Sequence, residues 1–184
     1  ASVAVLEARH VGWNASGHHL GTVMPGYELA AEDLVGRLGG DHARELWALS
    51  QQGVDHARAL AGEMPDAARL TATGALEVSH VDLGEKLAAR LDRLGALGAR
   101  VEGWPVARLR ATLRTARYFQ AIHHPDAFHV DASAYLAGLA ALARAAGVRI
   151  FEDTPVVSYE ASGIRKRIMT ASARLRAAHI VLAT

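Results

Sequence analysis

The chain has 184 residues, of which 51% are hydrophobic and 21% are charged. This length and balance predict one globular domain or two small ones. Lys and Arg number 20 and Asp and Glu number 19, and the net charge of +1 argues against a dedicated nucleic-acid-binding protein. The sequence has no cysteine, which excludes a disulfide scaffold, a thiolate zinc site and a cysteine nucleophile.

No apolar run reaches the roughly 20 residues that a membrane-spanning helix needs, and no signal peptide is visible. We therefore expect a cytoplasmic protein. The apolar runs at 2–7 and 179–184 each predict a short buried strand. Because domain boundaries normally fall in exposed linkers, this pattern predicts a piece of a larger protein. A natural small protein with terminal strands is the alternative.

Between the two ends, the spacing of apolar residues predicts alternating helices and strands. Glycines punctuate residues 11–26, which predicts a loop. Helical patterns lie at 28–38, 41–62, 83–97, from Pro105 onward and at 132–146. Strand patterns lie as a pair around 69–79, at 117–123, 127–130, 148–151 and 155–159, and as a hairpin over 164–175. Asp41 and Asp131 are the expected N-caps of two of the helices, and Gly147 is expected to end the last helix.

A short apolar strand that ends in an acid has a known use in dinucleotide-binding folds. The carboxylate at the end of the second parallel strand accepts hydrogen bonds from a ribose diol. Glu7 follows the first apolar run and fits this role. On this feature alone, a solvated strand end is the competing interpretation.

The residues around Glu7 extend this hypothesis. The stretch V-A-V-L-E-A-R-H-V-G-W-N-A-S-G (residues 3–17) resembles the second strand and following loop of flavin-dependent amine oxidases. That family includes D-amino-acid, glycine, sarcosine and γ-glutamylputrescine oxidases. The resemblance resumes at 129–131, continues through L-A-G-L, G-V-R-I and E-D-T-P-V, and ends with A-A-H-I-V-L-A-T at 177–184. It covers the chain nearly end to end, although residues 28–125 match only in pattern.

The resemblance implies an α/β fold, with an FAD/NAD(P)-binding, Rossmann-like parallel core that is incomplete here. A smaller mixed-sheet substrate domain would be inserted into this core. The implied divisions are 1–66 and 127–184 for FAD binding and 67–126 for a partial substrate domain. The strands of the parallel core are expected near 3–7, 148–151 and 179–183.

The resemblance also implies FAD as the cofactor and assigns residues to it. Glu7 would hold the adenosine ribose, and Ser16 would add a hydroxyl donor to a loop whose small residues let the backbone approach the pyrophosphate. Arg9 would lie along the adenine face or be solvated, and both interpretations stay open. Val156 matches the position whose backbone meets the adenine edge. The expected cofactor-binding residues are Glu7, Ala8, Arg9, Gly12, Ala15, Ser16, Gly17, Gly21, Val156, Ala183 and Thr184.

The sequence departs from the family pattern at two histidines. The family commonly has Arg-Asn-Gly-Gly where this chain has His-His-Leu-Gly, and commonly has Gly at the position of Asn14. His18 and His19 are therefore the candidate catalytic residues, since either could bind an acidic substrate group or stabilise anionic reduced flavin. A pair of loop imidazoles without a catalytic part is the alternative.

No metal site is expected. Neither the pair His18 and His19 nor the pair His123 and His124 can readily chelate, because adjacent residues of an extended chain point in opposite directions. A third ligand at suitable spacing is also missing from both pairs.

The glycine-rich G-x-G-x-x-G turn, expected about 20 residues before the acid, is missing from the sequence. The leading hypothesis is an FAD-dependent oxidase that transfers a hydride from an amine or amino acid to flavin, with oxygen as acceptor. The alternatives are another flavin dehydrogenase of the same fold and an inactive, cofactor-free fragment. The expected partner is a small amine or amino-acid substrate, with no nucleic acid and no membrane span, and the oligomeric state stays open.

Overall fold

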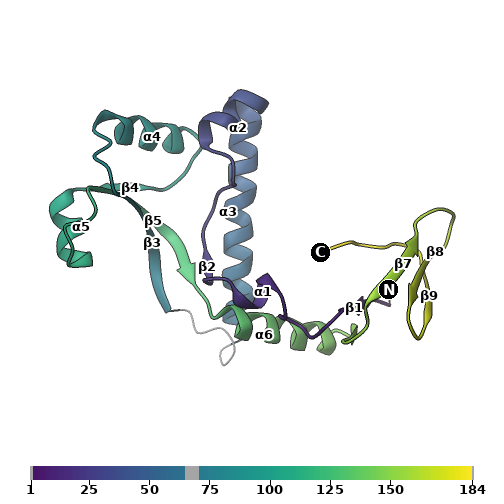
Figure 1. The fold of residues 1–184 in the computed structure, drawn as a ribbon. Coiled ribbons are helices and arrows are strands. Elements are labelled where there is room, and N and C mark those ends of the chain that lie inside the picture. The colour runs from purple at the N-terminus through teal and green to yellow at the C-terminus, as the bar shows by residue number, and fades with distance from the viewer. Residues whose placement is uncertain (1, 65–70, 184) are drawn as a thin grey trace. The chain divides into compact units, whose positions relative to one another are not determined.

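The computed structural model describes residues 2–64 and 71–183 (Figure 1). Its contacts divide the chain into two compact units. Unit 1 comprises Ala1–His19 and Ala132–Thr184, and unit 2 comprises Leu20–Asp131. The functional division into 1–66, 67–126 and 127–184 concerns cofactor and substrate binding, and it stays a prediction.

The first part of unit 1 is a parallel strand pair with two helices. Its elements are β1 (Ala4–Leu6), α1 (Ala15–His18), α6 (Ala132–Ala145) and β6 (Arg149–Phe151). β1 and β6 pair in parallel with Ala4 opposite Arg149, as the resemblance implies for the strands near 3–7 and 148–151. Between α6 and β6, Gly147 takes a φ of +85°, a conformation that favours glycine, and the helix ends beside it as expected.

The second part of unit 1 is an antiparallel sheet of three strands. These are β7 (Val156–Glu160), β8 (Lys166–Thr170) and β9 (Arg174–Ala177). The predicted hairpin is confirmed: the Thr170 backbone N–H donates to the Ala173 carbonyl at 2.9 Å, and the Ala173 N–H donates to the Thr170 hydroxyl at 2.9 Å. Tyr159, Ile168 and Leu175 align across the three strands.

The prediction of a strand over 179–183 is wrong. The structure assigns no strand to these residues, and Val181 is 87% exposed. An apolar run becomes a strand only where a sheet edge satisfies its backbone N–H and C=O groups. Within the described residues, β1 and β6 pair only with each other.

Unit 2 contains a four-stranded sheet with β5 (Gln120–His129) at its centre. β5 pairs antiparallel with each of its three neighbours, so the sheet is antiparallel where a mixed sheet was expected. The neighbours are β2 (Thr22–Val23), β3 (Thr71–Ser79) and β4 (Glu102–Trp104). β3 is one strand where a strand pair around 69–79 was predicted, and residues 69 and 70 lie outside the described residues.

The strands predicted at 117–123 and 127–130 are also a single strand, β5, and Pro125 lies inside it. β4 pairs only as far as His123, and β2 begins pairing at Phe128. The register with β3 shifts in the same interval. The missing N–H of Pro125 therefore costs no regular ladder bond, which explains why a proline is tolerated here.

The helices of unit 2 lie where their patterns predict them. They are α2 (Ala31–Leu38), α3 (Gly40–Gly62), α4 (Glu85–Ala96) and α5 (Val106–Leu113). α3 begins at Gly40, so Asp41 lies in its first turn and is not its cap. The core of the unit joins α2, α3, α4 and β5 through buried side chains, which are Ala31, Leu34, Ala43, Trp47, Leu94, Leu97 and Ile122. None of the helices in the described ranges is long and apolar enough to cross a membrane.

A polar cluster connects β3 and β5 with α4. His124 is buried, and its Nε2 lies 3.6 Å from Oε2 of Glu77, while Oε1 of Glu77 lies 2.6 Å from Nη1 of Arg90. The His124 imidazole, more than the Arg90 guanidinium, lowers the pKa of the Glu77 carboxyl below its usual range, and partial burial opposes both effects. A carboxylate with a lowered pKa stabilises the fold above its unfolded pKa, and the contribution is lost as the pH falls through the folded pKa.

We predict that Glu77→Gln lowers the melting temperature by about 2 °C near pH 7, because the Glu77 and Arg90 side chains are half-exposed and their attraction is partly screened. The difference from the parent protein should close as the pH falls well below about 4.3, the ordinary glutamate pKa. Thermal melts followed by circular dichroism at both pH values test this. Glu45→Gln, on an exposed site of α3, serves as the control. A difference that persists unchanged in acid would contradict the assignment.

Candidate functional site

The loop after β1 and the turn after β6 are hydrogen-bonded side by side. The Glu7 N–H donates to the Phe151 carbonyl at 2.9 Å, and the Thr154 N–H donates to the Glu7 carbonyl at 2.8 Å. The Asp153 N–H donates to the Arg9 carbonyl at 2.7 Å. Parallel strands end at the same edge of a sheet, and these bonds extend the pairing beyond that edge. Glu7 is therefore fixed at the carboxyl end of the parallel pair.

Two carboxylates stabilise the same loop. Oε1 of the half-buried Glu7 accepts the Arg9 N–H at 2.9 Å, and Glu7 Oε2 makes no hydrogen bond to any described residue. Oε1 of Glu152 accepts the Val11 N–H at 2.7 Å, and its Oε2 lies 4.0 Å from Nη2 of Arg144. Glu152 thus has a structural role, whereas one carboxylate oxygen of Glu7 makes no hydrogen bond to a described residue.

Arg9 lies over an aromatic ring that sequence reasoning did not select. Its guanidinium carbon is 5.6 Å from the ring centroid of Trp13. The His10 ring meets the same indole edge-on, with the centroids 4.9 Å apart. Arg9, His10 and Trp13 thus form a polar and aromatic cluster on the loop. The cluster is open to a ligand at Trp13, whose side chain is 53% exposed. An adenine ring could stack on such a cluster.

Gly12 and Gly17 bring the loop and α1 into direct contact. Gly12 has a φ of +83°, and a Cβ added at Gly17 would lie 2.0 Å from the Gly12 carbonyl oxygen. A Cβ at Gly12 would lie 3.6 Å from Cδ1 of Leu136 on α6. Ala15 and Ser16 are exposed on α1. The small residues of this loop thus allow close packing of backbone on backbone.

Val156 lies near this loop in unit 1, and Gly21 belongs to unit 2. Val156 begins β7, two residues after the Thr154 that bonds to Glu7, and it is 44% exposed. Gly21 belongs to unit 2, where its carbonyl accepts the Val130 N–H at 2.9 Å. A Cβ at Gly21 would lie 1.9 Å from the Val130 oxygen, so its close approach is to the backbone after β5.

The remaining predicted residues lie at exposed positions. Ala8 is exposed between Glu7 and Arg9, and Ala183 is exposed outside any helix or strand. His18 ends α1, and His19 follows it in an extended conformation; both are exposed. Thr184 lies outside the described residues. No group of three or more His, Asp or Glu in the described ranges could hold a metal ion.

The residues around Glu7 fit the adenosine end of FAD. A ribose diol offers two hydroxyl donors, and Glu7 presents an acceptor oxygen at the end of a parallel strand. The neighbouring Ala8 and Arg9 are exposed rather than packed over the carboxylate.

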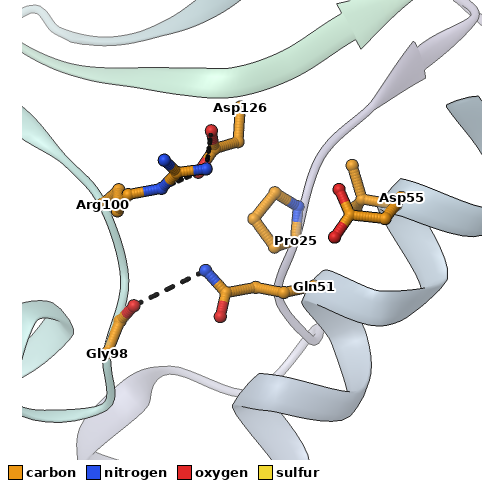
Figure 2. A pocket seen from close by; sticks show the side chains of 7 residues that line it. Pro25, Gln51, Asp55, Gly98, Arg100 and Asp126 are labelled. Carbon is orange, nitrogen blue, oxygen red and sulfur yellow. Dashed lines mark hydrogen bonds and ion pairs between the residues drawn. The ribbon is translucent and has the colours of Figure 1, made fainter.

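Unit 2 contains a polar pocket of about 290 Å³, shown in Figure 2. Arg100 donates to both carboxylate oxygens of Asp126, at 2.8 and 2.6 Å. Gln51 Nε2 lies 3.5 Å from the Gly98 carbonyl across the pocket. Asp55 also lines it, and its carboxylate makes no hydrogen bond or ion pair with a described residue. Sequence reasoning missed this set, because these contacts connect distant segments and leave no local motif.

A second, wider hollow of about 630 Å³ lies between α4, β4 and α5. Trp104 and Phe119 line it, together with Arg110. Beside it, Nε1 of Trp104 donates to Oε2 of Glu102 at 3.0 Å, and this bond is the main cause of a lowered pKa of the Glu102 carboxyl. The sequence contained no spacing pattern that pointed to this hollow.

Comparison with known proteins identifies the family. The model of the DAO family, described as FAD dependent oxidoreductase, matches residues 1–184. The chain is 27% identical over 191 residues to a probable oxidoreductase, OrdL, of Haemophilus influenzae, covering 99% of this chain and 43% of the relative. The chain therefore spans less than half the length of that relative.

Solved structures show the same fold. Glycine oxidase from Geobacillus kaustophilus matches with a TM-score of 0.79 and 20% identity, over 96% of this chain and 47% of that one. L-amino acid deaminase from Proteus myxofaciens matches with a TM-score of 0.72 and 19% identity, over 95% and 38% of the two chains. These matches confirm the expected α/β fold class, and the family match shows that the chain belongs to the DAO family of FAD-dependent oxidoreductases.

Proposed function

We propose that this chain forms the adenosine end of an FAD site and part of a substrate domain in an enzyme that oxidises a small amine or amino acid. Family membership supports the cofactor, and the names of the matching glycine oxidase and L-amino acid deaminase support the substrate class. The observation that carries the proposal is the free oxygen of Glu7 at the carboxyl end of the parallel pair.

The residues near β1 have defined roles in this proposal. Glu7 accepts hydrogen bonds from the ribose, and Arg9 with Trp13 borders the adenine. Val156 presents its backbone to the adenine edge. Gly12 and Gly17 keep the loop short and close to α1, so that no side chain enters the nucleotide site.

The rest of the proposal rests on the family resemblance. Gly21, Ala183 and Thr184 would contact other parts of the cofactor, with Ala15 and Ser16 near the pyrophosphate. His18 and His19 are the candidates for binding an acidic substrate group or for stabilising negative charge. The division into 1–66, 67–126 and 127–184 and a cytoplasmic location also belong to the proposal. The chemistry that FAD supplies when bound is acceptance of a hydride from the carbon bearing the amine, with oxygen as the final acceptor.

The direct test is to titrate the intact protein with FAD and to screen amines and amino acids for turnover. We expect quenching of flavin fluorescence and peroxide formation with at least one substrate. Turnover with an artificial dye and no peroxide would favour a dehydrogenase that uses another acceptor. No flavin binding at all would contradict the proposal and support a cofactor-free chain.

Glu7→Gln should weaken FAD binding by about 10- to 100-fold, because hydrogen bonds to a charged acceptor contribute about 1.5–3 kcal/mol. Flavin fluorescence titration measures this change. Glu160→Gln, an exposed site on β7, should bind FAD as the parent protein does. Equal affinity of the Glu7 variant and the parent protein would remove Glu7 from the site.

Gly17→Ala should lower the melting temperature by several degrees, about 2–4 °C for each kcal/mol of overpacking. The added Cβ meets a backbone oxygen, which cannot move aside as a side chain can. Gly36→Ala is the matched control, because a Cβ there has no atom within 4 Å and alanine favours the α2 helix. That variant should be as stable as the parent protein or more stable, and the two thermal melts decide the outcome.

A further inference from the structure

The β8–β9 hairpin carries the strongest concentration of like charge in unit 1. Residues 161–178 contain five basic side chains and no acidic one. The basic residues are Arg165, Lys166, Arg167, Arg174 and Arg176. The four arginines are exposed, while Lys166 is half-buried and its Nζ donates to the Gly163 carbonyl at 2.7 Å.

Three of these arginines lie on one face of the sheet, which we call the basic face: Arg167, Arg174 and Arg176. Arg167 on β8 is directly opposite Arg176 on β9, and Arg174 precedes Arg176 by two residues on the same strand. Like charges that face each other across two strands destabilise the pairing. The single ion pair on this face in the described structure is between Arg167 and Glu160, at 3.7 Å. An external anion would relieve the remaining repulsion.

An apolar side chain stands at the end of the same sheet. Ile164 lies in the loop between β7 and β8, immediately before Arg165, and it is 95% exposed. No other large hydrophobic residue in the described ranges is more exposed. A single exposed isoleucine is common on protein surfaces, but its position beside a concentration of arginines is informative.

The two units also differ in net charge, and the unit that carries the basic face is the basic one. Unit 1 holds 8 of the 20 basic residues and 4 of the 19 acidic ones, whereas unit 2 has an excess of acidic residues. The net charge of +1 therefore conceals a basic unit and an acidic unit. Such asymmetry is typical of proteins that interact with a polyanionic surface.

We propose that the basic face and Ile164 form a docking surface for a membrane that contains anionic lipids. Guanidinium groups bind lipid phosphates in a bidentate manner, and basic residues are attracted to an anionic leaflet. The Ile164 side chain enters the boundary between headgroups and acyl chains, where an apolar group is stabilised.

Lipid fits the observations better than nucleic acid does. Single-stranded nucleic acid is bound through aromatic stacking beside the cations. The aromatic residue of this sheet, Tyr159, aligns with Ile168 and Leu175, which alternate with the arginines along the strands and therefore lie on the opposite face. The basic face thus offers charge without a stacking platform, while the nearby loop offers an apolar group that suits the acyl boundary of a membrane.

The test measures cosedimentation of the intact chain with phosphatidylcholine vesicles, with and without phosphatidylglycerol. We expect binding only to the vesicles that contain phosphatidylglycerol, and loss of that binding in about 1 M salt, where the Debye length falls to about 3 Å. Replacing Arg167, Arg174 and Arg176 together by Gln should weaken partitioning on the order of 100-fold. Ile164→Ser should weaken it by about 10-fold, through loss of apolar burial.

The matched control replaces Arg37, Arg110 and Arg117 of unit 2 by Gln, which removes the same charge from exposed sites elsewhere. This variant should bind vesicles as the parent protein does, and circular dichroism should show that all variants are folded. Equal loss in the control would show a nonspecific charge effect and overturn the proposal. The proposal would also be overturned if the parent protein did not bind the vesicles that contain phosphatidylglycerol, or if the Ile164 variant bound them as the parent does. Stronger binding of the parent protein to a single-stranded oligonucleotide than to these vesicles would overturn it as well.

Discussion

The hydrogen bonds between the loop after β1 and the turn after β6 are the constraint on which the proposed nucleotide site depends. Glu7 donates its N–H to Phe151 and accepts at its carbonyl from Thr154, so its backbone is held on both sides. Without the second strand, Glu7 would be an acid at a solvated strand end, free to adopt many side-chain conformations. The parallel pair and the turn bonds fix the backbone of Glu7, and the Arg9 N–H holds one oxygen of its carboxylate. The other oxygen is the one that we propose for the ribose.

The same constraint connects parts of the chain that are far apart in sequence. The Val11 N–H and the Glu152 carboxylate that accepts it are 141 residues apart. The intervening chain includes all of unit 2, which folds around its own sheet and core. An insertion between two strands is tolerated when its ends return to fixed positions, because the entropy of loop closure grows slowly with length. Unit 2 can therefore vary its pockets while β1 and β6 keep their pairing.

Local patterns predicted the elements that carry their own signals. β1, β6 and α6 follow from apolar runs, helical spacing and Gly147, and Glu7 follows from the strand that it ends. Patterns failed where pairing partners decide the outcome. The apolar run at 179–183 has the composition of a strand but pairs with no strand of the described residues. Pro125 is tolerated because it lies in an interval without regular pairing.

The candidate site shows the same limit of sequence reasoning. The residues of the Glu7 loop could be proposed as a site because they lie within eleven positions of one another, from Glu7 to Gly17, and their role stays a prediction. The pocket in unit 2 could not, since its Arg100–Asp126 pair connects a loop before β4 to β5. Nothing in either local sequence marks the two residues as partners. Trp13 was overlooked for another reason: a lone exposed aromatic carries no pattern until Arg9 and His10 are seen to contact it.

The strand pair that holds Glu7 cannot supply its own stability. A two-stranded sheet is marginal in water, and β1 and β6 leave Val5 42% and Phe151 41% exposed. The stabilising contacts come from elsewhere in unit 1: α1 packs on α6, where Gly138 and Ala140 are buried, and Gly12 fits beneath Leu136. The order of the loop is therefore set by helix packing and by the turn bonds more than by the strand pair. The small residues that let the backbones approach thus decide the conformation of the loop that carries Glu7.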